Sequence, residues 1–121
     1  MERSEFFDQE TVDDVTVITL DGKEVLDREK LSELREAISS LVDQEHPHKL
    51  LVDFGGVQYC TSEFIGVLIR AHRRLAQDNG RIDLCNLQPT IHEVFKTLNL
   101  DGTMFRIHDT RGTALTELQQ C

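Results

Sequence analysis

Four consecutive residues, Cys60 to Glu63, bring together a thiol, two hydroxyls and a carboxylate. They follow a glycine turn, Gly55-Gly56, and lead directly into an amphipathic segment that begins at Phe64. The pattern predicts that these groups enter the first turn of a helix, where backbone N–H groups are unpaired and the helix dipole favours negative charge. Such a position suits a phosphate, a charged switch residue or an anionic group of a partner. It does not by itself suit the breaking of a covalent bond.

Ser62 and Cys60 are the candidates for a nucleophile. The run around Ser62, YCTSEF, lacks the G-x-S-x-G pattern of a nucleophile elbow. Cys60 is either a thiolate whose pKa falls at a helix N-terminus or a small apolar residue at the helix entrance, and the second interpretation is favoured. No histidine and carboxylate are spaced as an acid–base pair. Gly55-Gly56 fit neither a dinucleotide-binding nor a P-loop pattern. We therefore expect no enzyme activity and no cofactor.

Metal and disulfide chemistry are not expected either. The three cysteines, Cys60, Cys85 and Cys121, are odd in number and far apart, with no C-x-x-C pair. The five histidines are scattered, and the His46–His48 segment, with its central proline, is interpreted as an exposed turn rather than a metal site. Cys85 is expected in the core. Unpaired, reduced thiols favour a cytoplasmic protein.

The length of 121 residues predicts a single domain spanning residues 1–121. The net charge of −9 argues against a nucleic-acid or anionic-membrane surface. No apolar run is long enough to span a membrane, and the acidic N-terminus has no apolar signal core. Basic residues gather at Arg70, Arg73 and Arg74, but a solvated helix end is favoured over a binding patch.

The elements that must position these groups follow from the hydrophobic periodicity. Alternating polarity and β-branched residues predict strands at Phe6–Thr11, Val15–Leu20, Lys49–Phe54, Arg81–Cys85 and Phe105–His108. Apolar residues three or four apart predict helices that begin at Asp27 as N-cap, near Thr61–Glu63 and at Pro89. A final helix is predicted with its core at Thr113–Leu118.

The order of these elements is β-β-α-β-α-β-α-β-α. After a first hairpin about Asp13-Asp14, helices and strands alternate, which gives parallel strands with right-handed crossovers. We predict an α/β fold with a mixed sheet of four to five strands and about four helices.

Several segments share the pattern of one known family. The pattern is an apolar strand that ends in Asp, a turn, and Asp-Ser-Ser-Gly-Leu-Gly opening an apolar helix. The matching segments here are Leu26-Asp27, Leu51–Phe54, Ile65–Leu68, Gly80–Cys85 and Pro89–Leu100. From about Val15 to Leu118 the chain resembles a STAS domain, the module found in anti-sigma factor antagonists and in sulfate-transporter tails. The resemblance implies a STAS-like single domain.

The resemblance also locates a departure. Aligned on Ile65–Val67, the family's Asp falls on Thr61, its first Ser on Ser62, its phosphoacceptor Ser on Glu63 and the next Gly on Phe64. In phospho-switched members a partner serine kinase, itself an anti-sigma factor, phosphorylates the acceptor serine and thereby ends its own binding. A carboxylate forms no stable phosphate ester. Glu63 instead places about one fixed negative charge there, against about two for phosphoserine.

The resemblance implies a non-enzymatic regulator that binds a kinase-type anti-sigma factor or related regulator through the start of the second helix. A PP2C-type phosphatase is a further implied partner. Ser62 is the candidate for phosphorylation, with Thr61 as the second choice. The implied partner-binding residues are Asp27, Thr61, Ser62, Glu63 and Phe64.

Two alternatives stand beside this hypothesis. In the plainer one, Thr61 simply caps the second helix and Glu63 is an acid of its first turn. In the other, the chain is a small-ligand- or nucleotide-binding STAS module, or a lipid-transport accessory module of the type that works as the partner of an ATPase subunit.

Overall fold

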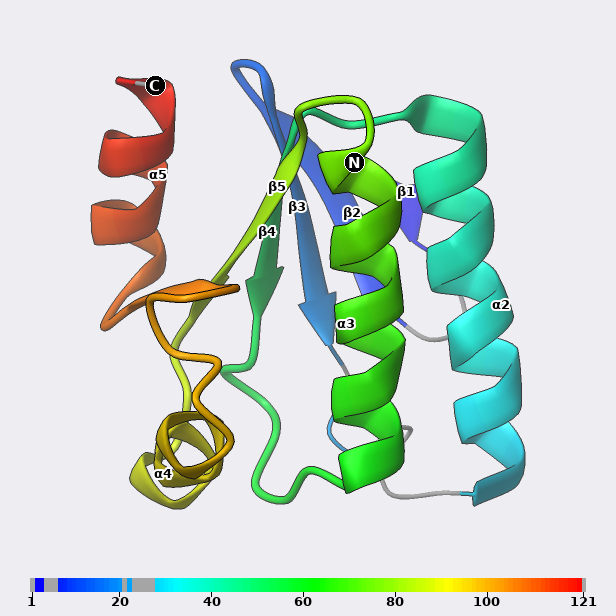
Figure 1. Ribbon diagram of the computed structural model, residues 1–121. Helices are drawn as coiled ribbons and strands as arrows, with labels where there is room; N and C mark the ends of the chain where they lie inside the picture. The colour runs from blue at the N-terminus through cyan, green and yellow to red at the C-terminus, as the bar shows by residue number, and fades with distance from the viewer. Residues whose placement is uncertain (1, 4–6, 21, 23–27, 121) are drawn as a thin grey trace.

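The computed structural model describes residues 2–3, 7–20, 22 and 28–120. Strands and helices alternate along most of this length, as Figure 1 shows. In chain order the elements are β1 (Glu2–Arg3), β2 (Phe7–Val12), β3 (Val15–Leu20), α2 (Arg28–Glu45), β4 (Lys49–Asp53), α3 (Ser62–Ala76), β5 (Arg81–Cys85), α4 (Pro89–Thr97), β6 (Arg106–His108) and α5 (Arg111–Gln119).

The strands form one mixed sheet in the order β1-β2-β3-β4-β5-β6. β1, β2 and β3 pair antiparallel, and β3 to β6 pair parallel. Asp13, in the turn between β2 and β3, adopts a positive φ of 54°, which Asp tolerates better than most residues. The predicted α/β class and mixed sheet are confirmed, and the described residues hold the four predicted helices. The two-residue strand β1 is an addition to the predicted sheet.

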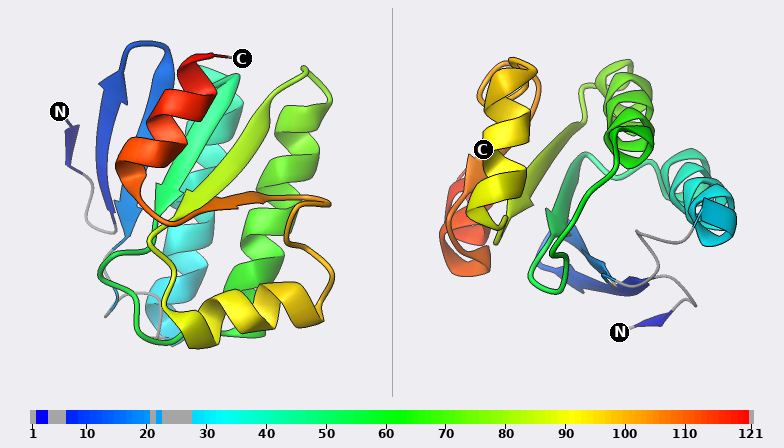
Figure 2. Two further views of the ribbon diagram at one scale, coloured as in Figure 1. Left: turned by 90° about the vertical axis from the view of Figure 1, so that its left-hand side faces the viewer. Right: turned by 90° about the horizontal axis from the view of Figure 1, so that it is seen from below.

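The helices are divided between the two faces and one end of the sheet. α2 and α3 lie side by side on one face, α5 lies on the other, and α4 lies near the end at which β4 finishes and α3 begins (Figures 1 and 2). The strand alternation explains this layering. On β4, Leu50 and Val52 join the core beneath α2 and α3, whereas Leu51 joins the cluster beneath α5.

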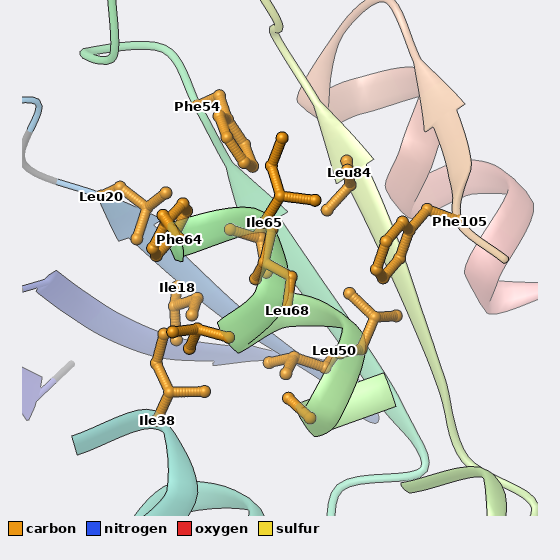
Figure 3. Packing of buried hydrophobic residues seen from close by; sticks show 14 of the residues in the cluster. Ile18, Leu20, Ile38, Leu50, Phe54, Phe64, Ile65, Leu68, Leu84 and Phe105 are labelled. Carbon is orange, nitrogen blue, oxygen red and sulfur yellow. The ribbon is translucent and has the colours of Figure 1, made fainter. Parts of the chain in front are cut away.

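Four phenylalanines connect the core to the entrance of α3. Phe54, just after β4, lies edge-on to Phe64 in the first turn of α3, with ring centroids 6.1 Å apart. Phe54 also meets Phe95 of α4 at 6.3 Å, and Phe95 meets Phe105, just before β6, at 5.9 Å. All four side chains are fully buried. Figure 3 shows the Phe54 side chain just after β4 and the Phe64 side chain at the start of α3.

Several details differ from the sequence prediction. β2 continues to Val12 instead of ending at Thr11, and β6 begins at Arg106 instead of Phe105. The Phe54 position, predicted as the last residue of a strand, already belongs to the turn after β4. Val94 and Leu98 belong to the apolar pattern of α4, yet 42% and 51% of their surfaces are exposed because α4 turns only Ile91 and Phe95 into the core. The predicted N-cap Asp27 lies outside the described residues.

A polar cluster fastens α5 to the sheet. The Arg111 guanidinium, at the start of α5, donates to Asp53 Oδ2 at 3.0 Å, to Glu10 Oε1 at 2.6 Å and to Thr19 Oγ1 at 2.6 Å. Asp53 is the last residue of β4, whereas Glu10 lies within β2 and Thr19 within β3. The Asp53 carboxylate is buried, and three donated hydrogen bonds hold Arg111 across the strand ends.

We expect Arg111→Met to lower the free energy of unfolding by about 2 kcal/mol, because the buried Asp53 carboxylate loses a charged donor. Arg106→Met is the matched control, since Arg106 also pairs with α5, through Glu117, but is 60% exposed. The control should cost less than about 1 kcal/mol. Urea denaturation of both variants measures the difference. Equal losses would show that the cluster is not what fastens α5.

Candidate functional site

The connection between β4 and α3 is built so that its path is fixed. Asp53 Oδ1 accepts hydrogen bonds from the Gly55 backbone N–H at 2.8 Å and from Asn86 Nδ2 at 3.0 Å. The backbone of Gly22 passes so close to Gly56 that a Cβ atom there would lie 2.0 Å from the Gly56 carbonyl oxygen. The turn is therefore tied to β5 and to the chain beyond β3, and it delivers the next residues to α3 in a defined position.

Thr61 is the N-cap of α3. Its backbone is extended, with φ −84° and ψ 156°, and its Oγ1 accepts a hydrogen bond from the Phe64 backbone N–H at 3.1 Å. The sequence prediction of Thr61 as N-cap is confirmed. Its hydroxyl oxygen is engaged in stabilising the first turn of the helix.

Ser62 and Glu63 are the first two residues of α3, and both side chains are exposed. Within the described part of the chain, neither side chain has a hydrogen bond or an ion pair. A hydroxyl and a carboxylate are thus held side by side on a capped helix end. They are available to another molecule.

Phe64 behaves differently from its neighbours. Its side chain is fully buried against Phe54 and belongs to the core. The surface at the start of α3 is therefore formed by Ser62 and Glu63, with Phe64 fixing the helix beneath them. The Asp27 position lies outside the described residues, so the structure does not place it.

A groove of about 480 Å³ runs between the first halves of α2 and α3 and begins at these two residues. The two helices run in the same direction on one face of the sheet, so their N-terminal halves lie together (Figure 1). The groove is lined by Leu31, Ser32 and Arg35 of α2 and by Ser62, Glu63, Gly66, Val67 and Arg70 of α3. Ser62 and Glu63 were expected at the site from the sequence, whereas the contribution of α2 was not. The 3.6-residue period predicts each exposed helix face but not which two faces meet.

The basic residues of α3 have separate environments. Arg74 pairs with Asp43 of α2, with 2.9 Å between Nε and Oδ1. Arg70 lines the groove, and Arg73 has no ion pair within the described residues. The prediction that these arginines are solvated at a helix end therefore holds for Arg73. Arg70 and Arg74 instead face α2.

Cys60 is not an activated nucleophile. Its side chain is half-buried, and burial raises its pKa to about 12. The Sγ atom lies 3.7 Å from the Thr61 carbonyl oxygen, and the side chain packs against the main core. The structure supports the small-apolar interpretation that the sequence favoured over a thiolate. Cys85 is fully buried, as predicted.

The described residues contain neither a membrane-spanning helix nor a cluster of metal-binding side chains. None of the described helices is both long and apolar enough to cross a membrane. Among the same residues, no three or more histidine, cysteine, aspartate or glutamate side chains are grouped so as to hold a metal ion.

Comparison with known proteins identifies the class to which this fold and site belong. The family model described as "Mlab, STAS domain" matches residues 7–108. This protein therefore belongs to the STAS domain family, as the sequence pattern implied.

Individual relatives agree with this family. The anti-sigma F factor antagonist of Paenibacillus polymyxa is 23% identical over 105 residues, which cover 87% of each chain. The structure of an anti-sigma factor antagonist from Mycobacterium paratuberculosis superposes with a TM-score of 0.80, at 24% identity, over 93% of this chain and 92% of its own. The structure of the anti-sigma factor antagonist SpoIIAA in its unphosphorylated form superposes with a TM-score of 0.72 at 25% identity. The match covers 95% of this chain and 99% of SpoIIAA. The phosphorylated form of SpoIIAA from Bacillus superposes with a TM-score of 0.71 at 26% identity, over 93% of this chain and 98% of its own.

Removal of the Thr61 hydroxyl should destabilise the fold. We expect Thr61→Ala to lower the free energy of unfolding by about 1 kcal/mol, because the Phe64 N–H loses its acceptor. Ser62→Ala, one residue on, should change it by less than about 0.5 kcal/mol, because the Ser62 side chain is exposed. Thermal or urea denaturation gives both values. A larger loss for Ser62→Ala would mean that the cap has been assigned to the wrong hydroxyl.

The thiols should be inert in the native protein. Burial raises the pKa of Cys60 and of Cys85 to about 12, so at pH 8 both are almost entirely protonated. In a Cys121→Ser variant, iodoacetamide should therefore modify the native chain far more slowly than the same chain unfolded in urea. Mass spectrometry of timed samples measures both rates. Rapid native labelling at Cys60 would contradict the buried-thiol assignment.

Proposed function

We propose that this STAS protein is a non-enzymatic, cytoplasmic regulator of the anti-sigma factor antagonist type. It binds a serine-kinase-type anti-sigma factor, or a related regulator, through the start of α3 and the groove beside it. The observation that carries the proposal is the exposed Ser62–Glu63 pair at the capped end of α3. The names of the relatives in Paenibacillus and Mycobacterium support the same class of function.

In this proposal Glu63 is a direct contact for the partner. It occupies the position that the family alignment assigns to the phosphoacceptor serine, and its carboxylate has no ion pair among the described residues. A cation on the partner, such as an arginine, would form a charge-assisted hydrogen bond with it. The permanent charge of Glu63 then stabilises the complex. In phospho-switched members of the family, by contrast, the charge of phosphoserine ends binding.

Ser62 is the proposed acceptor if the partner retains kinase activity towards this chain. Its hydroxyl is exposed, whereas the Thr61 oxygen accepts the capping hydrogen bond from Phe64 N. Modification of Thr61 would cost the helix its cap. A PP2C-type phosphatase becomes a partner only when Ser62 carries phosphate.

A second candidate function has one observation in its favour. The description of the matching family model names Mlab, not an anti-sigma factor antagonist. It corresponds to a lipid-transport accessory STAS module that assists an ATPase subunit. An affinity for such a subunit, with none for a kinase-type anti-sigma factor, would select this function over the first.

The substitution Glu63→Ser tests the role of the carboxylate. We expect it to weaken binding of the kinase-type anti-sigma factor by about tenfold, because one charge-assisted contact is lost. Stability should fall by at most about 1 kcal/mol. Calorimetric titration against each serine-kinase-type anti-sigma factor encoded in the same genome gives the affinities, with Glu93→Ser on α4 as the control for a lost surface charge. Tighter binding by Glu63→Ser would mean that Glu63 acts as a fixed imitation of phosphoserine.

Phosphopeptide mapping tests the acceptor. After incubation with the same anti-sigma factor and ATP, phosphate is expected on Ser62 and absent from a Ser62→Ala variant. Phosphate on Thr61 would contradict the assignment of its hydroxyl to the cap. If neither residue is labelled while binding is retained, the phosphorylation step is absent from this protein and the binding function stands.

A further inference from the structure

The groove between α2 and α3 contains two arginines that nothing in the described protein neutralises. Arg35 of α2 and Arg70 of α3 both line it, and both side chains are exposed. Among the described residues, neither makes a hydrogen bond or an ion pair. In contrast, Arg74, Arg81, Arg106 and Arg111 each pair with a carboxylate.

This placement is unexpected for such an acidic chain. The protein has 22 acidic and 13 basic residues, so carboxylates are abundant. Two like charges that share one groove repel each other, and the repulsion is relieved when an anion lies between them. The charge pattern therefore suits an anionic group from another molecule.

The floor of the groove carries an independent signal. Gly66 lies within α3, where a glycine is less favourable than an alanine. A Cβ atom built on Gly66 would meet nothing within 4 Å, so the packing of this protein does not require a glycine there. Because Gly66 has no side chain, the helix backbone is open there. Arg70 lies one turn further along α3. A requirement for close approach by another molecule explains a glycine in this position.

The chemistry of the groove distinguishes between kinds of anion. Glu63 lies at one end, and the whole chain has a net charge of −9, so a free phosphate or nucleotide with two or more negative charges would be repelled more strongly than a single carboxylate. Leu31 and Val67 give the groove apolar walls. A side chain with an apolar stem and a single carboxylate satisfies both requirements. Arginine guanidinium groups bind carboxylates with two parallel hydrogen bonds.

We propose that the groove receives a segment of the protein partner whose aspartate or glutamate carboxylate binds between Arg35 and Arg70, over Gly66. The segment carries a basic residue near this acid, which faces Glu63 at the groove's end. The inference rests on the proposed function and specifies the chemistry of its interface.

Three arginine variants test the charge. Arg35→Ala and Arg70→Ala should each weaken binding of the kinase-type anti-sigma factor by about tenfold in calorimetric titration. Arg73→Ala should change it by less than about twofold. Arg73 is the matched control because it is an exposed arginine of the same helix outside the groove, with no ion pair in the described residues. Circular dichroism confirms that all three variants remain folded.

Two glycine variants test the close approach. Gly66→Ala should raise the melting temperature, since it favours the helix and meets no atom, yet weaken binding at least fivefold. Gly112→Ala, in the first turn of α5, is the control, because a Cβ atom there also meets no close contact. It should leave binding unchanged. A gain in stability with a loss of affinity is a result that a purely structural role for Gly66 does not give.

The outcomes separate this inference from the function on which it rests. If the wild-type protein binds and Glu63→Ser weakens it, but Arg35→Ala and Arg70→Ala behave like Arg73→Ala, the groove inference is wrong and the proposed function stands. If no kinase-type anti-sigma factor binds the wild type, both are wrong. If ATP or inorganic phosphate binds with an affinity that depends on Arg35 and Arg70, the groove is a site for a small anion and the protein-segment inference is overturned.

Discussion

The Asp53 carboxylate joins three parts of the molecule: the turn after β4, the turn after β5 and the start of α5. One oxygen accepts from the backbone of Gly55 and from Asn86, which fixes the turn leading out of β4 to the turn after β5. The other accepts from Arg111, which brings the start of α5 to the same point. A buried carboxylate is costly unless its oxygens are satisfied, so loss of any of these contacts should destabilise the fold. The path from β4 to α3 depends on them.

Beyond this joint, apolar packing sets the direction of α3. Phe64 enters the core within the first turn and meets Phe54 from the other side of the connection. A helix held by its cap on one side and by a buried ring on the other has little freedom to rotate. Ser62 and Glu63 are consequently turned outward as a pair. The site gains its precision from residues that are themselves hidden from any partner.

The sequence predicted most of the fold because the local signals agree with the tertiary structure. The strands Val15–Leu20 and Arg81–Cys85 have the predicted bounds. Turn residues flank each strand, and the alternation of apolar and polar residues within it determines which side chains face the core. Thr61 was predicted as a cap from its residue type and its position before an apolar run. Val94 and Leu98 fit the helical period equally well but remain exposed, because periodicity does not tell how wide the covered stripe of a helix is.

The parts of the site that the sequence did not predict depend on pairs of residues distant in the chain. Arg111 and Asp53 are 58 residues apart, and no local pattern links a basic residue near the C-terminus to the end of β4. Arg35 and Arg70 likewise line one groove because of how α2 and α3 lie across the sheet. Each of these arginines, taken alone, reads as an ordinary solvated residue. Only their common groove distinguishes them.

The lengths of the outer strands affect how this protein behaves at high concentration. The sheet ends in β1, with two residues, and in β6, with three. Strands this short offer few free backbone donors and acceptors, so the sheet of a second molecule finds little to extend. The outermost strand at each edge of the described sheet is therefore a poor template for pairing with another molecule.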